Sequence, residues 1–300
     1  MVKPDVTVSV VIPNLNSRFI HNTLAALRAQ QFDMGQVEVL VVGLDEPGLV
    51  QADDPVRLLS TGEPVSPAIA RNIGIKAAQG QIICFTDADC LPAPDWLKQL
   101  VQKLSEPQVQ VVGGGVLFEA QNYWSWCDNL SWFHEFLASA PAGPRGFLPS
   151  LNLAVRRPVI EAVGLFDEGY PQAGGEDADW TLRMRIAGFP LHFEPAVVVT
   201  HVPNRTTFRK TWQHSFTYGC YSTKINPKYR AFLQPSIFLT FWPLLALLTP
   251  LLAASTTWRA IRHGRLIKQA WLAGPGIYLG KVAWCLGAIA ALSRSKGQAT

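Results

Sequence analysis

The stretch ARNIGIKAAQGQIICFTDADC, Ala70–Cys90, holds helix-forming residues, a strand-forming run and two acids in immediate succession. Its first half continues a predicted helix that begins at Ser66, because serine is a good N-cap and a proline follows in the first turn. Its second half, Gln81–Thr86, is short and largely apolar, which is typical of a strand buried in a parallel sheet. This predicted strand runs directly into Asp87 and Asp89.

Strand-like and helix-like segments alternate on both sides of this stretch. We expect strands at Val6–Ile12, Val37–Val42, Val56–Ser60, Val109–Val116 and Ala196–Thr200, and helices at Thr23–Gln30, Ser66–Gln79 and Pro94–Leu104. The alternation predicts an α/β fold with a doubly wound, mostly parallel sheet and helices on both faces. Ligands of such sheets bind beyond the carboxyl ends of the strands. The loops at Pro13–Asn16, Gly43–Glu46 and Asp87–Asp89 are therefore the predicted site.

The chain has two chemically different parts. Residues 1–205 hold 14 Lys and Arg against 22 Asp and Glu, whereas residues 206–300 hold 12 Lys and Arg and no acid. Phe232–Trp258 carries no charge and is long enough to cross a ~30 Å hydrocarbon core at ~1.5 Å per residue. A second apolar stretch, Gln269–Ser293, follows. We expect an α/β domain over 1–205 and a basic, membrane-associated helical region over 206–300.

Basic residues flank both apolar stretches and also lie between them, at 258–268. An anionic membrane is therefore a better partner than nucleic acid. All three basic flanks favour the cytoplasm, which conflicts with an ordinary two-span hairpin. We expect at least the first segment to be interfacial or re-entrant, since Pro243 and Pro250 interrupt helix hydrogen bonding. The scattered cysteines and the absence of a signal-like N-terminus indicate that the acidic part stays in the cytoplasm.

Asp87 and Asp89 have two possible roles. If the strand continues in extended form, alternate side chains face the same way, and both carboxylates can bind one Mg²⁺ or Mn²⁺ together with diphosphate oxygens. The alternative is a polar turn. His201 ends another strand-like run, where it is either structural or a metal ligand.

Gly174–Trp180, GGEDADW, is a glycine-hinged loop that leads into a helix. Its acids either complement the helix dipole or include a general base that stays ionised at neutral pH. Motifs for phosphate-binding loops, dinucleotide binding, zinc proteases and serine hydrolases are missing from the sequence.

Arg71 and Asn72 lie off the stripe that the helix around them is expected to bury. That predicted stripe is Ile69, Ile73 and Ala77. The two polar side chains either form a solvated face or present a cation and an amide to a diphosphate.

Together these segments resemble the family 2 glycosyltransferases, which have the GT-A fold. The resemblance covers Val8 to about His201. It is carried by SVVIPNLN (Ser9–Asn16), the Ala70–Cys90 stretch, NLAVRR…VGLFDE (Asn152–Glu168) and GGEDADWTLRMRIAG (Gly174–Gly188). Each segment is modest by itself, whereas the ordered set is specific.

The resemblance implies a role for each matching residue. Asp177 is implied as the catalytic base. Pro13, Asn16, Asp45, Arg71, Asn72 and Asp87 are implied to bind the nucleotide sugar, Glu176 and Trp180 the acceptor, and Asp89, Asp87 and His201 a divalent metal, Mg²⁺ or Mn²⁺. Asp45 stands one or two residues from the place where the family has paired acids.

The implied activity is that of a metal-dependent, hexosyltransferase-like, inverting glycosyltransferase. The resemblance also implies a nucleotide-sugar donor. Because of the membrane region, we expect a lipid-linked or glycolipid acceptor at the cytoplasmic face of the cell membrane, in cell-surface polysaccharide or glycolipid synthesis. A catalytically inactive, membrane-tethered nucleotide-sugar-binding protein is the alternative. A processive synthase is disfavoured because its Gln-x-x-Arg-Trp motif is missing, and a nucleotidyltransferase would have no use for the Glu-Asp block.

The segment Gln121–Phe136 concentrates three tryptophans, Trp124, Trp126 and Trp132. We expect a helix that packs on the sheet with its aromatic side chains in the core. A wall of the acceptor pocket and a surface that dips into lipid headgroups are the alternatives.

Overall fold

The computed structural model describes residues 6–51, 53, 55–202, 205–223, 225–235, 237–263 and 270–297. The chain forms two compact units, each described by itself below. The first comprises Met1–Leu117 and Ala138–Val202, and the second comprises Phe118–Leu137 and Pro203–Thr300. The first unit thus ends close to the predicted boundary at residue 205. The tryptophan-rich segment Gln121–Phe136 lies within Phe118–Leu137 and therefore belongs to the second unit.

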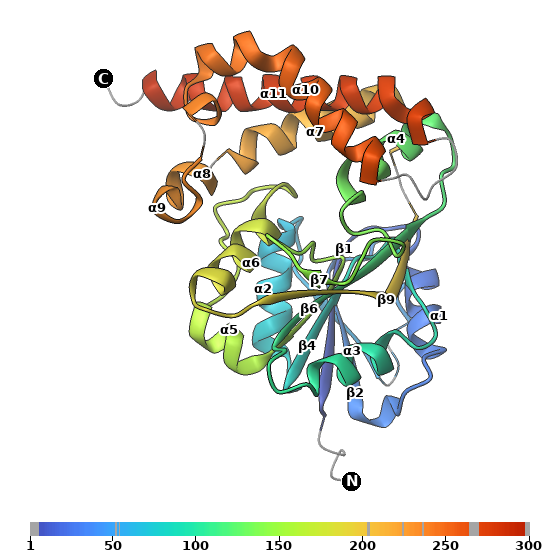
Figure 1. Ribbon diagram of the computed structural model, residues 1–300. Coiled ribbons are helices and arrows are strands. Elements are labelled where there is room, and N and C mark those ends of the chain that lie inside the picture. Colours follow the sequence, from blue (N-terminus) through green and yellow to red (C-terminus); the bar gives the residue numbers. More distant parts are fainter. Residues whose placement is uncertain are drawn as a thin grey trace. The chain divides into compact units, whose positions relative to one another are not determined.

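A mixed sheet forms the centre of the first unit (Figure 1). The strands are β1 (Val8–Leu15), β2 (Val37–Leu44), β3 (Val56–Ser60), β4 (Ile82–Thr86), β5 (Cys90–Pro92), β6 (Val111–Phe118), β7 (Gly143–Pro144), β8 (Asn152–Arg156) and β9 (Leu191–His201). Their order is β3-β2-β1-β4-β8-β6-β9-β5, and β7 pairs with β9. The strands β3, β2, β1 and β4 are parallel, whereas β8 runs antiparallel to β4 and β6. The predicted α/β fold is confirmed, but only half of the sheet is parallel.

Helices flank these strands. They are α1 (Ile20–Arg28), α2 (Pro67–Ala77), α3 (Trp96–Leu104), α5 (Arg157–Val163) and α6 (Glu176–Ile186), with a short 3₁₀ turn at Met34–Gln36. The strands β1, β2 and β4 are buried on both faces over nearly all of their length, and Val10, Val11 and Ile12 of β1 have no exposed surface. Complete burial of one such side chain stabilises the fold by roughly 1.5–3 kcal/mol.

The helix α2 turns a different face inward from the one predicted. Its N-cap is Ser66 as expected, since the hydroxyl accepts a hydrogen bond from the Ile69 N–H at 3.3 Å. A side chain at Gly74 would collide with Val11 of β1, so the missing side chain lets the helix approach the sheet. The buried residues are Ala68, Ala70, Arg71, Asn72, Gly74 and Ile75, whereas the predicted stripe of Ile69, Ile73 and Ala77 is only half-buried. The predicted stripe is therefore wrong.

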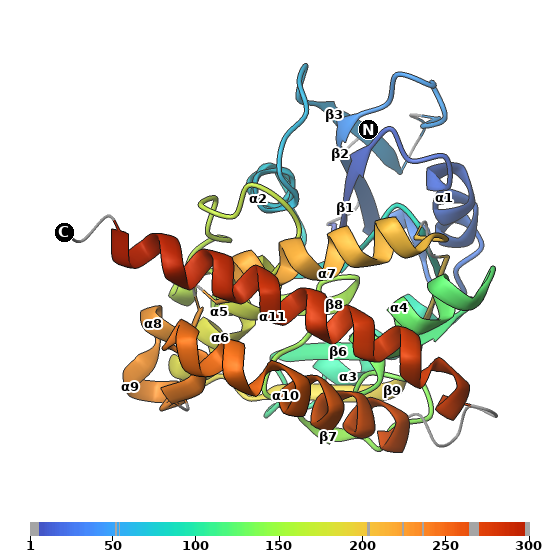
Figure 2. The ribbon, with the colours of Figure 1, turned by 90° about the horizontal axis from the view of Figure 1, so that it is seen from above.

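The second unit is helical (Figure 2). Its elements are α4 (Tyr123–Phe133), α7 (Phe208–Ser222), α8 (Ile225–Lys228), α9 (Arg230–Leu233), α10 (Trp242–His263) and α11 (Gly274–Gly297), with 3₁₀ turns at Ile237–Leu239 and Ala270–Ala273. The tryptophan-rich segment is a helix, α4, as predicted. It packs against α7 and α11 within this unit.

Two segments of the second unit are long and apolar enough to cross a membrane. They are α10, with a mean hydropathy of 1.4 over its best window, and Ala270–Arg294, with 1.5. The helix α10 is continuous through both prolines, with Pro250 in its interior. Residues 264–269, which hold part of the basic cluster predicted between the apolar stretches, lie outside the described residues.

Candidate functional site

The loops that follow β1, β2 and β4 are tied to one another by side-chain hydrogen bonds. Asn14 donates from Nδ2 to the Leu44 carbonyl at 2.7 Å, which joins the ends of β1 and β2. Ser17 donates from Oγ to the Ala88 carbonyl at 3.0 Å, which joins the β1 loop to the acids after β4. The three predicted loops therefore converge, and Pro13 lies half-buried at this end of β1.

Two residues predicted to bind the nucleotide stabilise the loops themselves. Asn16 has a left-handed backbone with φ of 55°, and its side-chain oxygen accepts a hydrogen bond from the Glu46 N–H at 2.8 Å. Both carboxylate oxygens of Asp45 accept backbone N–H groups of the next turn, from Leu49 at 3.1 Å and Val50 at 2.7 Å. Asp45 thus holds its own loop closed, which does not support the predicted contact with the nucleobase.

The acids Asp87 and Asp89 lie in a tight turn. The Cys90 N–H donates to the Asp87 carbonyl at 3.0 Å, so the backbone forms a turn here and does not continue the strand in extended form. The carboxylates nevertheless remain accessible, with 31% of the Asp87 side chain and 22% of the Asp89 side chain exposed. The His201 Nε2 atom at the end of β9 lies 3.7 Å from Asp89 Oδ2.

The donor groups in this turn fit a divalent cation that is bound jointly with a substrate. Among the described residues, no group of three or more His, Cys, Asp or Glu side chains is arranged to hold a metal by itself. Asp87 and Asp89 offer carboxylate oxygens, and His201 offers an imidazole nitrogen. Mg²⁺ and similar ions commonly take one or two carboxylates and complete their shell with phosphate oxygens and water.

Arg71 joins the acid turn to the start of α6. It is 3% exposed, and it donates from Nη2 to Asp87 Oδ1 and from Nη1 to Glu176 Oε1, both at 3.0 Å. Burial by itself would lower the pKa of the guanidinium, but the neighbouring carboxylates Asp87 and Glu176 raise it above its ordinary value. Burial likewise raises the pKa of Asp87, and Arg71 opposes that rise. Two nitrogens of the Arg71 guanidinium are therefore hydrogen-bonded to carboxylates, one to Asp87 and the other to Glu176.

Asn72 is fully used inside the fold. Its amide nitrogen donates to the Phe166 carbonyl at 3.0 Å and to Glu168 Oε1 at 2.8 Å, and its oxygen accepts the Phe166 N–H at 2.9 Å. Asn72 is 1% exposed. Its predicted contact with the nucleotide diphosphate is therefore wrong, and its role is to hold the loop after α5.

Trp180 belongs to the core of the first unit. It has no exposed surface, its ring stacks on Phe166 at 4.0 Å between centroids, and its Nε1 donates to the Gly164 carbonyl at 2.8 Å. A side chain in this position does not reach an acceptor, so the predicted acceptor contact is wrong.

Glu176 locks the start of α6. The helix begins after Gly175, whose φ of 111° favours glycine because it lies in the left-handed region. One carboxylate oxygen of Glu176 bonds Arg71, and the other accepts the Gly174 N–H at 2.8 Å. Since Glu176 is 3% exposed with both oxygens occupied, it positions the loop and does not present a surface to an acceptor.

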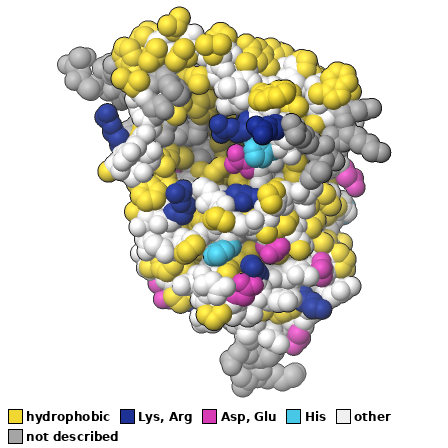
Figure 3. Space-filling view, in the orientation of Figure 1, with side chains coloured by type: hydrophobic (Ala, Val, Ile, Leu, Met, Phe, Trp, Pro, Cys, Tyr) yellow, Lys and Arg dark blue, Asp and Glu magenta, His cyan; other side chains and the backbone are white. Residues whose placement is uncertain are grey.

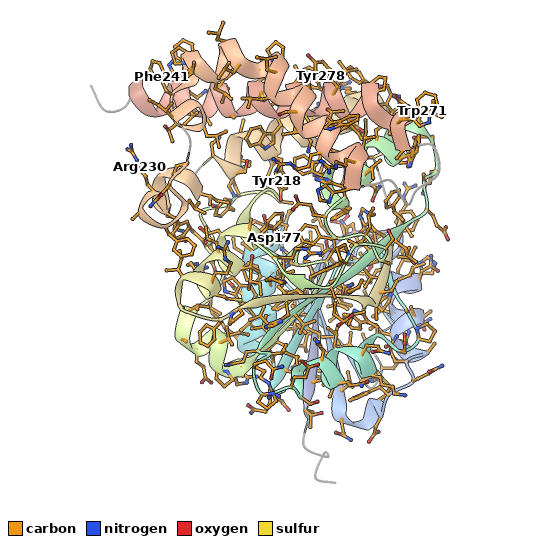
Figure 4. All side chains as sticks on the ribbon, viewed as in Figure 1. Asp177, Tyr218, Arg230, Phe241, Trp271 and Tyr278 are labelled. Atoms are coloured by element: carbon orange, nitrogen blue, oxygen red, sulfur yellow. The ribbon has the colours of Figure 1, made fainter. Side chains whose placement is uncertain are left out.

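Asp177 is the titratable group of this loop that remains half-buried at the site (Figure 4). Its carboxylate accepts the Ala178 N–H at 2.8 Å and the Ser150 N–H at 3.2 Å. Burial, and next the charge of Glu176, raise the pKa of Asp177 to about 7, although Arg71 acts in the opposite direction. A carboxylate with a pKa near 7 is suited to accept a proton at neutral pH.

Sequence reasoning missed two contributors to this site. Ser17 connects the β1 loop to the acid turn, and Ser150 donates its backbone N–H to Asp177. The first carries only the weak signal of a polar residue after a strand. The second carries no signal, because every residue except proline has a backbone N–H.

Comparison with known proteins places this geometry in a family context. The family profile described as Glycosyl transferase family 2 matches residues 9–164, more than half of the chain. Glycosyltransferase AglE of Haloferax volcanii is 32% identical over 203 residues, which are 65% of this chain and 66% of AglE. Pre-mycofactocin glycosyltransferase of Mycobacterium tuberculosis is 27% identical over 279 residues, which are 88% of this chain and 57% of that protein. The chain thus spans less than two thirds of the length of these relatives.

Solved structures share the fold. Mannosyltransferase PcManGT from Pyrobaculum calidifontis, in complex with GDP-Man and Mn²⁺, superimposes with a TM-score of 0.63 at 20% identity, covering 96% of this chain and 87% of that one. GalNAc-T7 with UDP, GalNAc and Mn²⁺ superimposes with a TM-score of 0.54 at 18% identity, covering 77% of this chain and 52% of that one. The predicted GT-A fold is confirmed by these similarities.

Proposed function

Because the chain belongs to glycosyl transferase family 2, we propose that it transfers a sugar from a nucleotide-sugar donor to an acceptor hydroxyl with inversion at the anomeric carbon. The observation that carries this proposal is the pair of hydrogen bonds through which Arg71 links Asp87 to Glu176, the residue before Asp177. The turn that carries Asp87 and Asp89 is thereby connected to the first turn of α6, which carries Asp177. The GDP-Man in one solved structure of similar fold and the UDP and GalNAc in another support the donor class.

Asp177 acts as the general base in this proposal. It accepts the proton of the acceptor hydroxyl while the oxygen attacks the anomeric carbon, and the bond to the nucleotide diphosphate breaks on the opposite face. A base of this kind contributes typically ~10²–10⁴-fold to the rate. The Ser150 and Ala178 N–H groups hold the carboxylate in place during the transfer.

A divalent cation, Mg²⁺ or Mn²⁺, is the proposed cofactor, and Asp87, Asp89 and His201 are its proposed protein ligands. When bound, it neutralises charge on the departing diphosphate. Arg71 donates to Oδ1 of Asp87 and so keeps this carboxylate oriented for metal binding. The Mn²⁺ in the two solved structures of similar fold supports a divalent ion.

The proposed acceptor is lipid-linked or a glycolipid, and the proposed location is the cytoplasmic face of the cell membrane. Two apolar helices in the second unit and the basic composition of residues 206–300 support this part of the proposal. A transferase that acts on water-soluble acceptors has no need of either feature. The corresponding pathway class is the synthesis of a cell-surface polysaccharide or glycolipid.

A direct assay uses membranes that contain the full chain and a panel of radiolabelled UDP, GDP and dTDP sugars. We expect label in the lipid fraction from at least one donor, loss of that label with EDTA, and recovery with Mn²⁺ or Mg²⁺. Membranes with the Asp177→Asn variant are the matched control. Transfer by neither membrane, or equal transfer by both, would contradict the proposal.

A further inference from the structure

The backbones of α7 and α11 touch within the second unit. A Cβ atom added at Gly219 of α7 would lie 2.0 Å from the Trp284 carbonyl oxygen, and one added at Gly287 of α11 would lie 2.0 Å from the Phe216 carbonyl oxygen. Two helices that meet at glycines in this way exclude side chains, lipid and water from the contact. The helix α11 is therefore fixed along α7.

Polar bonds fix the N-terminal half of α11 to its neighbours. The bonds are Gly276 N–H to Tyr123 Oη at 3.0 Å, Lys281 Nζ to the Ser131 carbonyl at 3.1 Å, and Trp284 Nε1 to Ser222 Oγ at 3.1 Å. The first two partners belong to α4 and the third to α7. A displacement of the N-terminal half of α11 away from these helices would break all three bonds.

The helices that hold α11 are too polar for a hydrocarbon core. Asp128 of α4 is 1% exposed and is paired with Arg205 at 2.6 Å and with His214 of α7 at 3.1 Å. Arg209 and Lys210, in the first turn of α7, are exposed. Charged groups and their helices are strongly disfavoured inside a bilayer. Since α11 does not separate from α4 and α7, it does not cross the bilayer by itself.

The helix α10 is apolar on the face that its own unit leaves uncovered. It buries a stripe formed by Leu245, Thr249, Ala253, Thr257 and Ala260. On the opposite side Leu247, Leu251 and Trp258 are 74%, 69% and 63% exposed, and Trp271, shortly before α11, is 67% exposed. Figure 3 shows hydrophobic side chains gathered over these C-terminal helices, and Figure 4 labels Trp271 among them. Exposed apolar residues concentrated in this way mark an interaction surface.

Cationic side chains border this apolar face. Arg259, Arg262 and His263 are exposed in the last turns of α10, where they line a hollow of about 610 Å³ together with Ser255 and Trp258. The sequence contains no acid after Glu194 that would neutralise them. Tryptophan and arginine beside an apolar face are typical of the boundary between lipid headgroups and acyl chains.

We propose that α10 and α11 lie in the plane of one membrane leaflet and do not span the bilayer. Leu247, Leu251 and Trp258 enter the acyl chains, while Arg259 and Arg262 contact the phosphates of anionic lipids. This inference rests on the membrane association in the proposed function and is independent of the transfer reaction. Insertion into the cytoplasmic leaflet alone would keep the protein on the side of the membrane where nucleotide sugars are supplied.

Nitroxide depth measurements test the orientation. Leu247→Cys, Leu251→Cys and Trp258→Cys variants of the full chain, in a Cys220→Ser background, are spin-labelled and reconstituted into vesicles of phosphatidylcholine and phosphatidylglycerol. The depth of each label is obtained from its collision rates with oxygen and with a nickel chelate. Because the three sites share one helix face, we expect the same depth at all three. A label at exposed Lys98 of α3 is the water-exposed control. A helix that crosses the bilayer would place Leu251 near the midplane and Leu247 and Trp258 each ~6 Å closer to opposite membrane surfaces, because α10 spans Trp242–His263 at ~1.5 Å per residue. A label at Leu251 that is deeper than the other two by this amount would overturn the proposal, as would full accessibility to nickel at all three sites.

A second measurement leaves the apolar face intact. Flotation of the otherwise native chain with phosphatidylcholine vesicles, with and without phosphatidylglycerol, is compared with the Arg259→Gln/Arg262→Gln variant. We expect the variant to partition about 5-fold more weakly per arginine into the anionic vesicles and equally into neutral ones. If the variant and the native chain bound equally well to the anionic vesicles, the proposed phosphate contacts would be refuted. Neither measurement uses a sugar donor, so a failure here leaves the transferase proposal standing.

Discussion

Arg71 and Asp87 form a hydrogen-bonded ion pair, 3.0 Å from Nη2 to Oδ1, although the arginine is 3% exposed. The other end of the guanidinium bonds Glu176, which lies 105 residues further along the chain. One side chain thus connects the turn after β4 with the first turn of α6. Because the site depends on this connection, the first prediction concerns its loss.

Arg71→Met should lower the free energy of unfolding by about 3–5 kcal/mol, because it leaves Glu176 buried without its cationic partner. Urea unfolding of the purified variant measures the change. The matched control is Arg28→Met, which removes a pair with Asp53 that is exposed on both sides and should cost less than about 1 kcal/mol. Equal effects of the two substitutions would show that the Arg71 pairs are energetically unimportant.

Transfer should slow as the pH falls through about 7. The base works only when deprotonated, and the Asp177 carboxyl has its pKa raised to about 7. Below that value we expect kcat/KM for the acceptor to fall about tenfold per pH unit. A rate profile that stays level down to pH 5 would argue against a base with this environment.

The same raised pKa predicts that Asp177→Asn stabilises the protein in alkaline solution. The folded state binds the Asp177 proton more tightly than the unfolded state, whose carboxyl titrates near 3.8. Stability is therefore lost as the pH rises from about 4 to about 7, by up to ~4 kcal/mol for a shift of about three units. The Asp177→Asn variant does not lose stability in this way, because the asparagine side chain does not titrate. Denaturation midpoints should coincide for the two proteins at pH 4, and the variant should be the more stable one at pH 8.

Asp89→Asn should raise the metal concentration for half-maximal transfer by at least ~10-fold. Even residues that only hydrogen-bond to metal ligands typically change metal affinity or activity by ~10–100-fold when they are substituted. Titration of transfer with Mn²⁺ and with Mg²⁺ measures this effect. Asp45→Asn is a suitable control, because its carboxylate bonds its own loop. A metal requirement changed equally by both substitutions would contradict the proposed ligand set.

The strands were predictable because local composition determines them. Val56–Ser60 has the same bounds in the prediction and in the structure, and β4 begins one residue later than predicted. Runs of β-branched residues between polar turns form strands wherever both faces are covered. Convergence of the loops after β1, β2 and β4 also followed from parallel pairing, which brings carboxyl ends to one edge.

The orientation of α2 was not predictable from hydropathy. Ranking its residues by polarity places Arg71 and Asn72 outside, whereas their partners bring them inside. Apart from Asp87, which bonds Arg71 from 16 residues away, those partners lie 94 or more residues away in the chain, and nothing in one sequence shows the pairing. Trp180 differs in the opposite way, since the resemblance implied an acceptor contact, whereas the side chain belongs to the core.

The turnover of Asp177→Asn tests the central claim most directly. The substitution keeps the size of the side chain and removes only its basicity, so donor binding should remain within a few-fold of the native value, measured with the nucleoside diphosphate and Mn²⁺. We predict that kcat falls by at least ~10²-fold, the low end of a general base's contribution. A folded variant that binds donor and turns over at a near-native rate would remove Asp177 from the reaction and contradict the account.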